Sequence, residues 1–467
     1  MKEQSGNRPE SRRSRPERFA AWRKRYVPDS VTLIVVSGLL GIAAGLCAFL
    51  LKFLIGHLTD LFTSRLHFDG PNYALLVIPA AGIVLAACYQ RYWLRDNLMH
   101  GTGRLMNDLR AHRYRLPGRL MYAPMVASTV TLGFGGSAGA EGPIAYTGAA
   151  IGSNIGRALG LPAPMLRILI GCGAGAGIAG IFKSPIGGVL FTLEVMKMQL
   201  STLSVLALVG AAVCGSLTCY VCTGFTADVG FFNTTPFDPG WLPWIAGLGL
   251  FCGLYSIYYS AVTDSMKRWF GRLRNPWVMN LAGGLILSAC VFMFPILYGE
   301  GYSTVTRVVN GDFGGLLGGS MLAGLGGDAP ALTLLMTAVL ALKCWATVSS
   351  NSAGGVAGDF APTIFAGAIA GFVYATAMNM LFGAQLPVGI FALLGTAGVF
   401  SGAIHAPLMA MFLTAEMADG YGYFLGLAVS AAVSYLTVKL IRPGSVYSTV
   451  EHDDIRALFH LGSRQPK

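Results

Sequence analysis

Charged side chains are scarce in this sequence. Asp, Glu, Lys and Arg together make up 12% of its 467 residues, whereas hydrophobic residues make up 54% and glycine occurs 62 times. Soluble domains carry roughly a quarter charged residues, so this composition excludes an ordinary soluble protein. It indicates a chain that crosses a membrane several times.

The sequence also lacks the residue sets of an enzyme or a redox centre. No HExxH motif and no comparable set of nucleophile and base occurs in its apolar stretches. The nine cysteines are odd in number and lie within apolar runs, which does not favour a disulfide framework. We therefore expect no enzymatic activity, no metal site and no cofactor.

Acidic residues are outnumbered, because 22 Asp and Glu stand against 33 Lys and Arg and give a net charge of +11. Nine of the basic residues fall between Lys2 and Arg25, before the first apolar run and without a cleavage signature behind them. The positive-inside rule predicts that this end stays in the cytoplasm, with the basic loops Arg104–Arg119 and Lys267–Arg274 on the same side. We attribute the positive charge to topology and to contact with anionic lipids of the bilayer, not to nucleic-acid binding.

Long apolar runs are the main feature that is present. Several approach or exceed the ~20 residues that span a bilayer as a helix. They are Val31–Gly56, Tyr73–Cys88, Leu203–Cys222, Trp241–Ser260 and Tyr423–Ile441. Others are shorter and are interrupted by Gly and Pro. Broken segments at membrane depth are tolerated only where they are buried in protein or line a cavity, so they indicate a channel or transporter.

An internal repeat divides the membrane region. Gly135–Gly152 aligns with Gly354–Gly371, and eight of the eighteen positions are identical. A second pair of segments, Phe182–Glu194 and Ile404–Glu416, aligns at nearly the same offset. These matches predict a duplicated membrane domain, and they leave open whether the two halves run parallel or inverted.

Each repeated segment contains the signal for the start of a helix. Pro143, Pro362, Pro185 and Pro407 each precede an apolar stretch, and proline is favoured in the first turn, where a backbone N–H has no partner. If these starts lie inside the membrane, their free N–H groups and positive dipole ends form a site for an anion. Such a site needs no Lys or Arg, which suits an ion that must also be released.

Glu141 is the one carboxylate in the first of these segments, two residues before Pro143. It lies where the helix start would attract an anion, so its side chain is predicted to act as a tethered substitute for the ion. Protonation or rotation of the side chain would then vacate the site. The alternative is a capping residue whose charge only complements the helix dipole.

These residues resemble the CLC family of chloride channels and proton-coupled chloride transporters. The segment GAEGP (Gly139–Pro143) is similar to the family signature G-[KR]-E-G-P, and GDFAP (Gly358–Pro362) matches G-x-F-x-P. GTGRL (Gly101–Leu105) is a degraded form of G-S-G-I-P, and SVYSTV (Ser445–Val450) resembles the C-terminal segment that supplies a tyrosine. The motifs occur in the family order and cover nearly the whole membrane region.

The resemblance implies roles for five residues. Glu141 takes the place of the gating glutamate, which competes with chloride and passes protons. Thr102 stands where the family has a chloride-ligating serine. Asp359 and Phe360 would supply backbone N–H groups to the chloride ion, and Tyr447 would offer its hydroxyl.

The resemblance also implies the architecture. We expect an all-α polytopic membrane protein with two inverted-topology repeats of short, tilted and broken helices, assembled as a homodimer with one pore per subunit. Residues 1–30 form a basic cytoplasmic tail, 31–230 and 231–441 form the two repeats, and 442–467 hold the tyrosine segment and a short cytoplasmic tail. Many members carry regulatory domains after the last helix, and we expect none here. The bacterial type of sequence implies the inner membrane, with both termini cytoplasmic.

Three departures from the family pattern bear on the mechanism. Ala140 replaces the basic residue before the gate, which removes a nearby positive charge. Arg104 and Leu105 replace Ile-Pro in the first motif. Glu194 is followed by Val195, where proton-coupled bacterial relatives have a second glutamate as the inner proton relay, and valine cannot carry a proton.

Two mechanisms therefore remain open. One is chloride/proton exchange, with Glu194, another acid or a water chain replacing the relay, and the other is passive chloride conduction gated by Glu141. A fluoride or other-anion exporter of the same family is a rival, disfavoured because Thr102 keeps the hydroxyl and Gly358–Pro362 is chloride-like. Lys343, within an apolar run, is expected to extend towards the membrane surface or to pair with a helix end.

Overall fold

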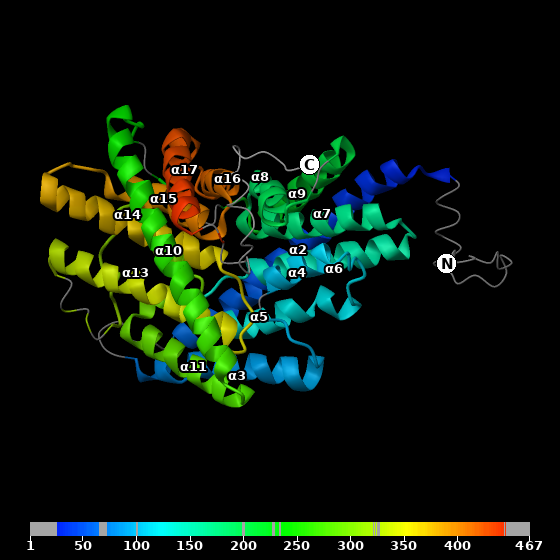
Figure 1. Cartoon of the computed structure of the whole chain (residues 1–467), viewed down its shortest axis with the longest axis horizontal. Helices are drawn as coiled ribbons and strands as arrows, with labels where there is room; N and C mark the ends of the chain where they lie inside the picture. The colour runs from blue at the N-terminus through cyan, green and yellow to red at the C-terminus, as the bar shows by residue number, and fades with distance from the viewer. Residues whose placement is uncertain are drawn as a thin grey trace, which may run out of the picture. The chain divides into compact units, whose positions relative to one another are not determined.

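The computed structural model describes residues 26–64, 72–99, 101–198, 201–226, 229–232, 235–320, 322, 324, 327–442 and 444. This part of the chain is helical (Figure 1). It contains no β-strand, and the one isolated bridge joins Gly139 to Gly358.

The first group of helices runs to Cys222. It consists of α2 (Asp29–Thr63), α3 (Ile78–Cys88), α4 (Gly101–Arg110), α5 (Ala123–Gly133), α6 (Glu141–Ala158), α7 (Ala163–Phe182), α8 (Pro185–Leu190) and α9 (Thr202–Cys222). Two of these helices continue as π-helical turns, α3 into η3 (Tyr89–Leu94) and α8 into η5 (Phe191–Val195). Short 3-10 turns occur at η2 (Tyr73–Leu76) and η4 (Gly118–Met121).

The second group begins after residue 235. It consists of α10 (Leu242–Arg272), α11 (Pro276–Met293), α12 (Tyr302–Val309), α13 (Ala329–Ser352), α14 (Phe360–Phe382), α15 (Val388–Ile404), α16 (Pro407–Met417) and α17 (Phe424–Ile441). Its 3-10 turns are η6 (Pro239–Trp241), η7 (Pro295–Leu297) and η9 (Tyr421–Tyr423).

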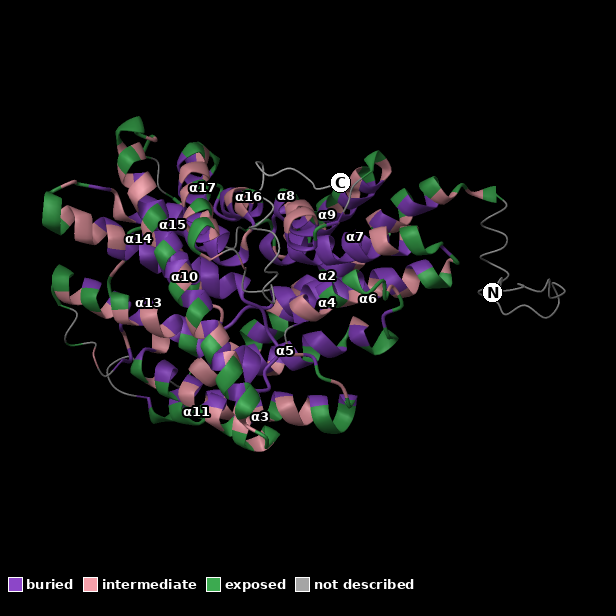
Figure 2. Cartoon of the chain, in the orientation of Figure 1, coloured by how far each residue is buried: buried purple, intermediate pink, exposed green. Residues whose placement is uncertain are grey.

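Length and composition make this a multi-pass membrane protein. Among the described residues, nine helical spans are long and apolar enough to cross a bilayer, and four further apolar helices are shorter. This mixture of full-length and short helices confirms the expected all-α polytopic fold. Large apolar side chains such as Leu39 and Leu250 are exposed, as lipid-facing residues are. Figure 2 shows exposed and buried residues alternating along α10.

The described residues form two compact units that interleave in the sequence. The first comprises the described parts of 1–50, 104–125 and 144–225, and the second those of 51–103, 126–143 and 226–467. The repeat boundaries at 230/231 and 441/442 remain a prediction.

The core of the first unit lies between α2, α7 and α9. Leu40, Leu169 and Leu208 are buried together there. Glycine allows the close approach of α2 to α9, since a Cβ at Gly41 would overlap the carbonyl oxygen of Ala211. Small residues at helix crossings are the usual means of tight packing in membranes, because the hydrophobic effect contributes little to helix association in lipid.

Glycine also allows a close helix crossing in the second unit. α15 is almost entirely buried, α14 is buried from Phe360 to Val373, and the two helices cross where Gly367 faces Gly395. A Cβ at either glycine would overlap the carbonyl oxygen of the other. This crossing fixes the position of α14, whose first residues form part of the candidate site.

All four predicted helix starts are confirmed. α8 and α16 begin at Pro185 and Pro407 themselves. α6 and α14 begin two residues before Pro143 and Pro362, at Glu141 and Phe360. The prolines therefore lie in the first turn in every case, as their missing N–H requires.

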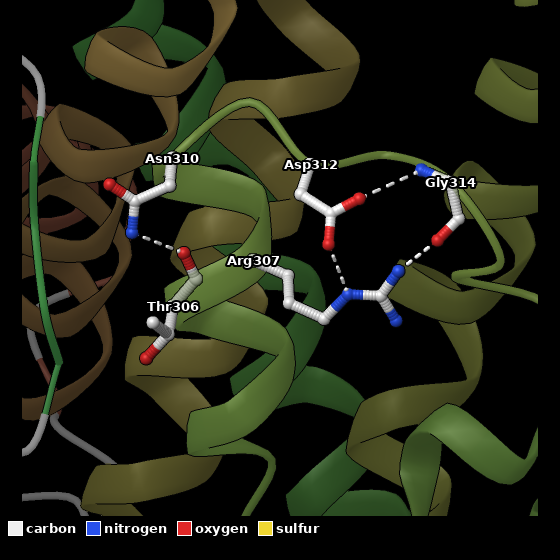
Figure 3. A network of polar contacts seen from close by, with 5 residues as sticks. All are labelled: Thr306, Arg307, Asn310, Asp312 and Gly314. Carbon is white, nitrogen blue, oxygen red and sulfur yellow. Dashed lines mark hydrogen bonds and ion pairs between the residues drawn. The ribbon is translucent and has the colours of Figure 1, made fainter.

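A polar turn ends α12 on the surface (Figure 3). Arg307 donates from Nε to Asp312 Oδ2 at 2.8 Å and from Nη2 to the carbonyl of Gly314, while Asn310 Nδ2 donates to the carbonyl of Thr306 at 2.7 Å. The hydrogen bond from Arg307 holds the pKa of the Asp312 carboxyl below its usual value. This turn lies outside the candidate membrane spans.

Candidate functional site

The sequence repeat pairs with itself inside the second unit. Gly139 and Gly358, which align in the repeat, form an antiparallel bridge: the N–H of Gly139 donates to the carbonyl of Gly358 at 3.0 Å, and the N–H of Gly358 donates back at 2.6 Å. Each residue of the second segment lies 219 positions after its counterpart (358 − 139 = 219).

Two further hydrogen bonds repeat this symmetry. The N–H of Ser137 donates to Ser350 Oγ at 2.9 Å, and the N–H of Val356 donates to Thr131 Oγ1 at 3.0 Å. The second bond is the first with both partners exchanged for their counterparts. Reciprocal pairs of this kind result from a local two-fold relation between the two segments, which favours inverted repeats over parallel ones.

Glu141 lies at the centre of this arrangement. It is the first residue of α6, it belongs to the second unit, and only 2% of its surface is exposed. Its Oε1 accepts the N–H of Phe360 and, at 3.2 Å, the N–H of Ala361. These are the first two residues of α14. The carboxylate thus occupies the place where a helix N-terminus binds an anion.

The two bridging glycines leave room for this carboxylate. A Cβ at Gly139 would overlap Glu141 Oε2, and a Cβ at Gly358 would lie 2.7 Å from Oε1. Glycine at both positions is therefore required for the observed placement of the side chain.

Thr102 lies next to the residues at the start of α6. It is the second residue of α4 and is buried. A Cβ at Gly142 would lie 3.1 Å from Thr102 Oγ1, so the hydroxyl is adjacent to the residue that follows Glu141. The structure brings Thr102, Glu141 and Phe360 together as the sequence motifs predict.

Asp359 occupies the N-cap position of α14, but its side chain does not cap that helix. It is buried, and its Oδ1 accepts a hydrogen bond from Asn351 Nδ2 at 2.9 Å. The helix N–H groups that an N-cap aspartate would bind are left to Glu141. Asp359 was expected to provide only a backbone N–H, so this buried carboxylate is a feature that the motif did not indicate.

Lys343 is a site residue whose place the sequence analysis did not predict. The expectation that it extends towards the membrane surface is wrong, because its side chain is fully buried. Its Nζ donates to Ser137 Oγ at 2.9 Å and lies 4.5 Å from the centre of the Phe365 ring. The one signal in the sequence was a lysine inside the apolar run LALKCWATV.

Glu300 adds a second carboxylate. Its Oε1 accepts the N–H of Ala140 at 3.1 Å, directly before Glu141. Lys343 interacts electrostatically with both Glu300 and Glu141. A basic side chain from α13, Lys343, therefore interacts with the two carboxylates that flank Ala140.

The other predicted positions belong to the first unit or fall outside the described residues. Glu194 is partly buried in the π-helical turn η5 of the first unit, and Val195 beside it is buried. Arg104, in the first unit, lies 5.8 Å from the ring centre of Tyr146. Tyr447 falls outside the described residues.

All nine cysteines are free thiols. Within the described ranges no group of three or more His, Cys, Asp and Glu residues is arranged to hold a metal ion.

The chain has many membrane helices and two repeats whose helix starts lie together. These features are typical of polytopic membrane transport proteins. The family described as voltage gated chloride channel, Voltage_CLC, matches residues 81–439, more than half of the chain. The chain therefore belongs to this family, whose members transport anions.

Individual proteins agree with this. The putative chloride channel protein ClcB-like of Ralstonia nicotianae is 30% identical over 386 residues, which cover 81% of this chain and 85% of the relative. The H(+)/Cl(-) exchange transporter ClcA of Klebsiella pneumoniae is 28% identical over 344 residues, or 71% of this chain and 68% of the relative. The crystal structure of a slow cyanobacterial Cl-/H+ antiporter has the same fold, with a TM-score of 0.74 and 22% identity over 92% of this chain and 98% of that one.

Proposed function

We propose that this protein transports chloride across the bilayer and that Glu141 is its gate. The observation that carries the proposal is the binding of the Glu141 carboxylate by the N–H groups of Phe360 and Ala361 at the start of α14. A chloride ion would take the same donors and the same dipole end once the side chain leaves.

Gating follows from the chemistry of the carboxyl group. An ionised carboxylate accepts hydrogen bonds at both oxygens, whereas a protonated one is neutral and presents an O–H donor at one of them. Protonation of Glu141 therefore weakens its hold on Phe360 and Ala361, and an anion replaces it. Because a proton and an anion exchange places at one site, the site itself provides a basis for coupling.

Chloride/proton exchange needs an inner route for the proton, through a second titratable group or a chain of water molecules. Two carboxylates support a route through titratable groups: Glu194 in η5, and Asp359, which is buried directly before Phe360 and interacts electrostatically with Lys267 near the end of α10. The buried Val195 supports the other form, passive conduction, because it interrupts the usual relay.

Chloride is favoured over fluoride by the hydroxyl of Thr102 beside Gly142 and by the intact pattern at Gly358–Pro362. We propose a transporter without enzymatic activity, a homodimer with one pore per subunit, placed in the inner membrane with both termini in the cytoplasm. Family membership supports the dimer, and the basic loops support the orientation.

Reconstituted protein tests the proposal. Liposomes loaded with chloride should release it, and Glu141→Gln should remove the pH dependence of the flux. Glu416→Gln, a carboxylate in α16, is the matched control and should behave as wild type. Flux that is absent in the wild type, or unchanged in rate and pH dependence in Glu141→Gln, would refute the gate.

The reversal potential under opposed chloride and proton gradients then separates the two forms. A value set by the chloride gradient alone identifies a channel. A value that moves with the proton gradient identifies an exchanger.

A further inference from the structure

A cavity of about 450 Å³ opens in the second unit between the end of α3 with its π-helical continuation η3 and the beginning of α11. Met99, Pro276 and Met279 supply apolar lining. Polar lining comes from the amides of Gln90, Asn97 and Asn280 and from the charged side chains of Arg91, Arg95 and Asp96.

The two arginines carry the charge of this cavity. Within the described residues neither Arg91 nor Arg95 forms an ion pair. Arg91 is positioned by Trp277, whose ring centre lies 5.4 Å from its guanidinium carbon. Asp96 is the opposing charge, and its Oδ1 accepts the N–H of Asn97 at 2.8 Å. The lining therefore has a net positive charge and guanidinium donors available to a ligand.

Aromatic residues around the cavity indicate its depth in the membrane. Trp93 is 82% exposed and Tyr92 is 66% exposed, next to the two arginines in sequence. Tyr92 also stacks on Trp277, with ring centres 6.2 Å apart. Exposed Trp and Tyr belts mark the level of the lipid headgroups. The basic stretch Lys267–Arg274 leads directly into α11.

We propose that this cavity binds the phosphate headgroup of an anionic phospholipid, in the leaflet that faces the basic loops. The phosphate oxygens are bound by the guanidinium groups of Arg91 and Arg95, which suit bidentate recognition. The exposed amide of Asn97 serves the polar remainder of the headgroup, whereas the buried amide of Asn280 donates to the carbonyls of Pro276 and Ala353. The exposed rings of Tyr92 and Trp93 border the acyl chains. Basic pockets between membrane helices are known sites for such headgroups.

Gln90 connects this cavity to the anion site. Its Nε2 donates to the carbonyl of Gly354 at 2.7 Å, and its Oε1 accepts the N–H of Leu98 at 2.8 Å. Gly354 begins the segment that leads to Phe360, and Leu98 precedes the helix that carries Thr102. An occupied cavity thus holds both segments, so lipid composition should change the transport rate. That second effect rests on the proposed chloride transport, whereas binding itself does not.

Binding is measured first, on the purified full-length protein by native mass spectrometry with phosphatidylglycerol and phosphatidylcholine. Phosphatidylglycerol should bind preferentially, and the double variant Arg91→Gln/Arg95→Gln should weaken its affinity by about 30-fold. Arg91→Lys/Arg95→Lys keeps the charge but loses the bidentate donors, so it should recover only part of the affinity, and that recovery shows that the glutamine variant has not simply unfolded. Arg268→Gln/Arg272→Gln is the matched control, because it removes the same amount of charge from another place, the end of α10.

If the control pair weakened phosphatidylglycerol binding equally, the lipid would be bound by diffuse surface charge and the cavity would not be its binding site. A phosphatidylglycerol affinity that millimolar inorganic phosphate abolishes, or equal binding of phosphatidylcholine, would overturn the lipid as the ligand. Chloride efflux is then compared in liposomes with and without phosphatidylglycerol. Wild type should respond to the lipid and Arg91→Gln/Arg95→Gln should not, while failure of all chloride efflux would count against the transport proposal and leave the binding result standing.

Discussion

Glu141 and Phe360 occupy equivalent positions in the two repeats, and the carboxylate of one accepts the N–H of the other. Each is the first residue of its helix, and they are separated by the same 219 positions as the paired glycines Gly139 and Gly358. One repeat therefore supplies an acid where the other supplies a backbone donor. This difference between two otherwise symmetric segments is the basis of the proposed gate.

The position of the Glu141 carboxylate depends on glycine at position 139, which has no Cβ. Gly139→Ala should displace the carboxylate, change the pH dependence of chloride flux and lower the free energy of unfolding by about 1–3 kcal/mol, because the new methyl overlaps Oε2. Flux assays and thermal unfolding in detergent measure both effects. Gly56→Ala is the control, since a Cβ there meets nothing within 4 Å. Equal behaviour of the two variants would contradict the assigned fit.

Lys343 is expected to balance the two carboxylates near the gate. Lys343→Met removes a buried positive charge beside Glu141 and Glu300, so chloride affinity should fall about tenfold. Adding Glu300→Gln should restore part of the loss, because the net charge of the cluster returns. Chloride titration by calorimetry gives the coupling energy of this double-mutant cycle. Strictly additive effects would show that the two groups do not interact.

The sequence predicted the helix starts that form this site better than the charged side chains around them. Glycine, proline and the repeat determine where helices start, and these are local properties, so Glu141 and Phe360 were placed correctly. The bond from Lys343 to Ser137 spans 206 positions and the bond from Glu300 to Ala140 spans 160, and no local pattern encodes such pairs. The diversion of Asp359 to Asn351 is likewise a result of tertiary packing.

The lengths of the helices were also predicted only in part. The apolar run Trp241–Ser260 marks α10, but the helix continues through a polar stretch to Arg272. The sequence patterns also do not predict the π-helical turns after α3 and α8.

Proton coupling should depend on carboxylates other than Glu141. In an exchanger, Glu194→Gln combined with Asp359→Asn should reduce proton transport at least tenfold while chloride flux persists, since neither side chain gates the anion. Simultaneous recording of proton and chloride flux measures the ratio, and the single variants divide the effect between the two residues. Unchanged coupling in the double variant would require a route formed by water alone.

The turn at Asp312 should give a small pH-dependent stability. The folded pKa of this carboxyl is lowered by its hydrogen bond from Arg307, so the stabilisation is present above the unfolded pKa and is lost as pH falls through the folded value. Asp312→Asn should lower the melting temperature slightly at pH 7 and have no effect in acid. Asp60→Asn, an exposed carboxylate in α2, is the control. A difference that grows on acidification would contradict the assignment.

The central claim is that the Glu141 carboxylate occupies the place of the transported anion. Crystals of Glu141→Gln soaked in bromide, measured by anomalous diffraction beside wild-type crystals, test it directly. We predict a bromide peak within hydrogen-bond distance of the N–H groups of Phe360 and Ala361 in the variant, and no peak at that place in the wild type while the carboxylate is bound there. A variant with no anion at the start of α14, or with bromide and the carboxylate bound side by side in the wild type, would contradict it.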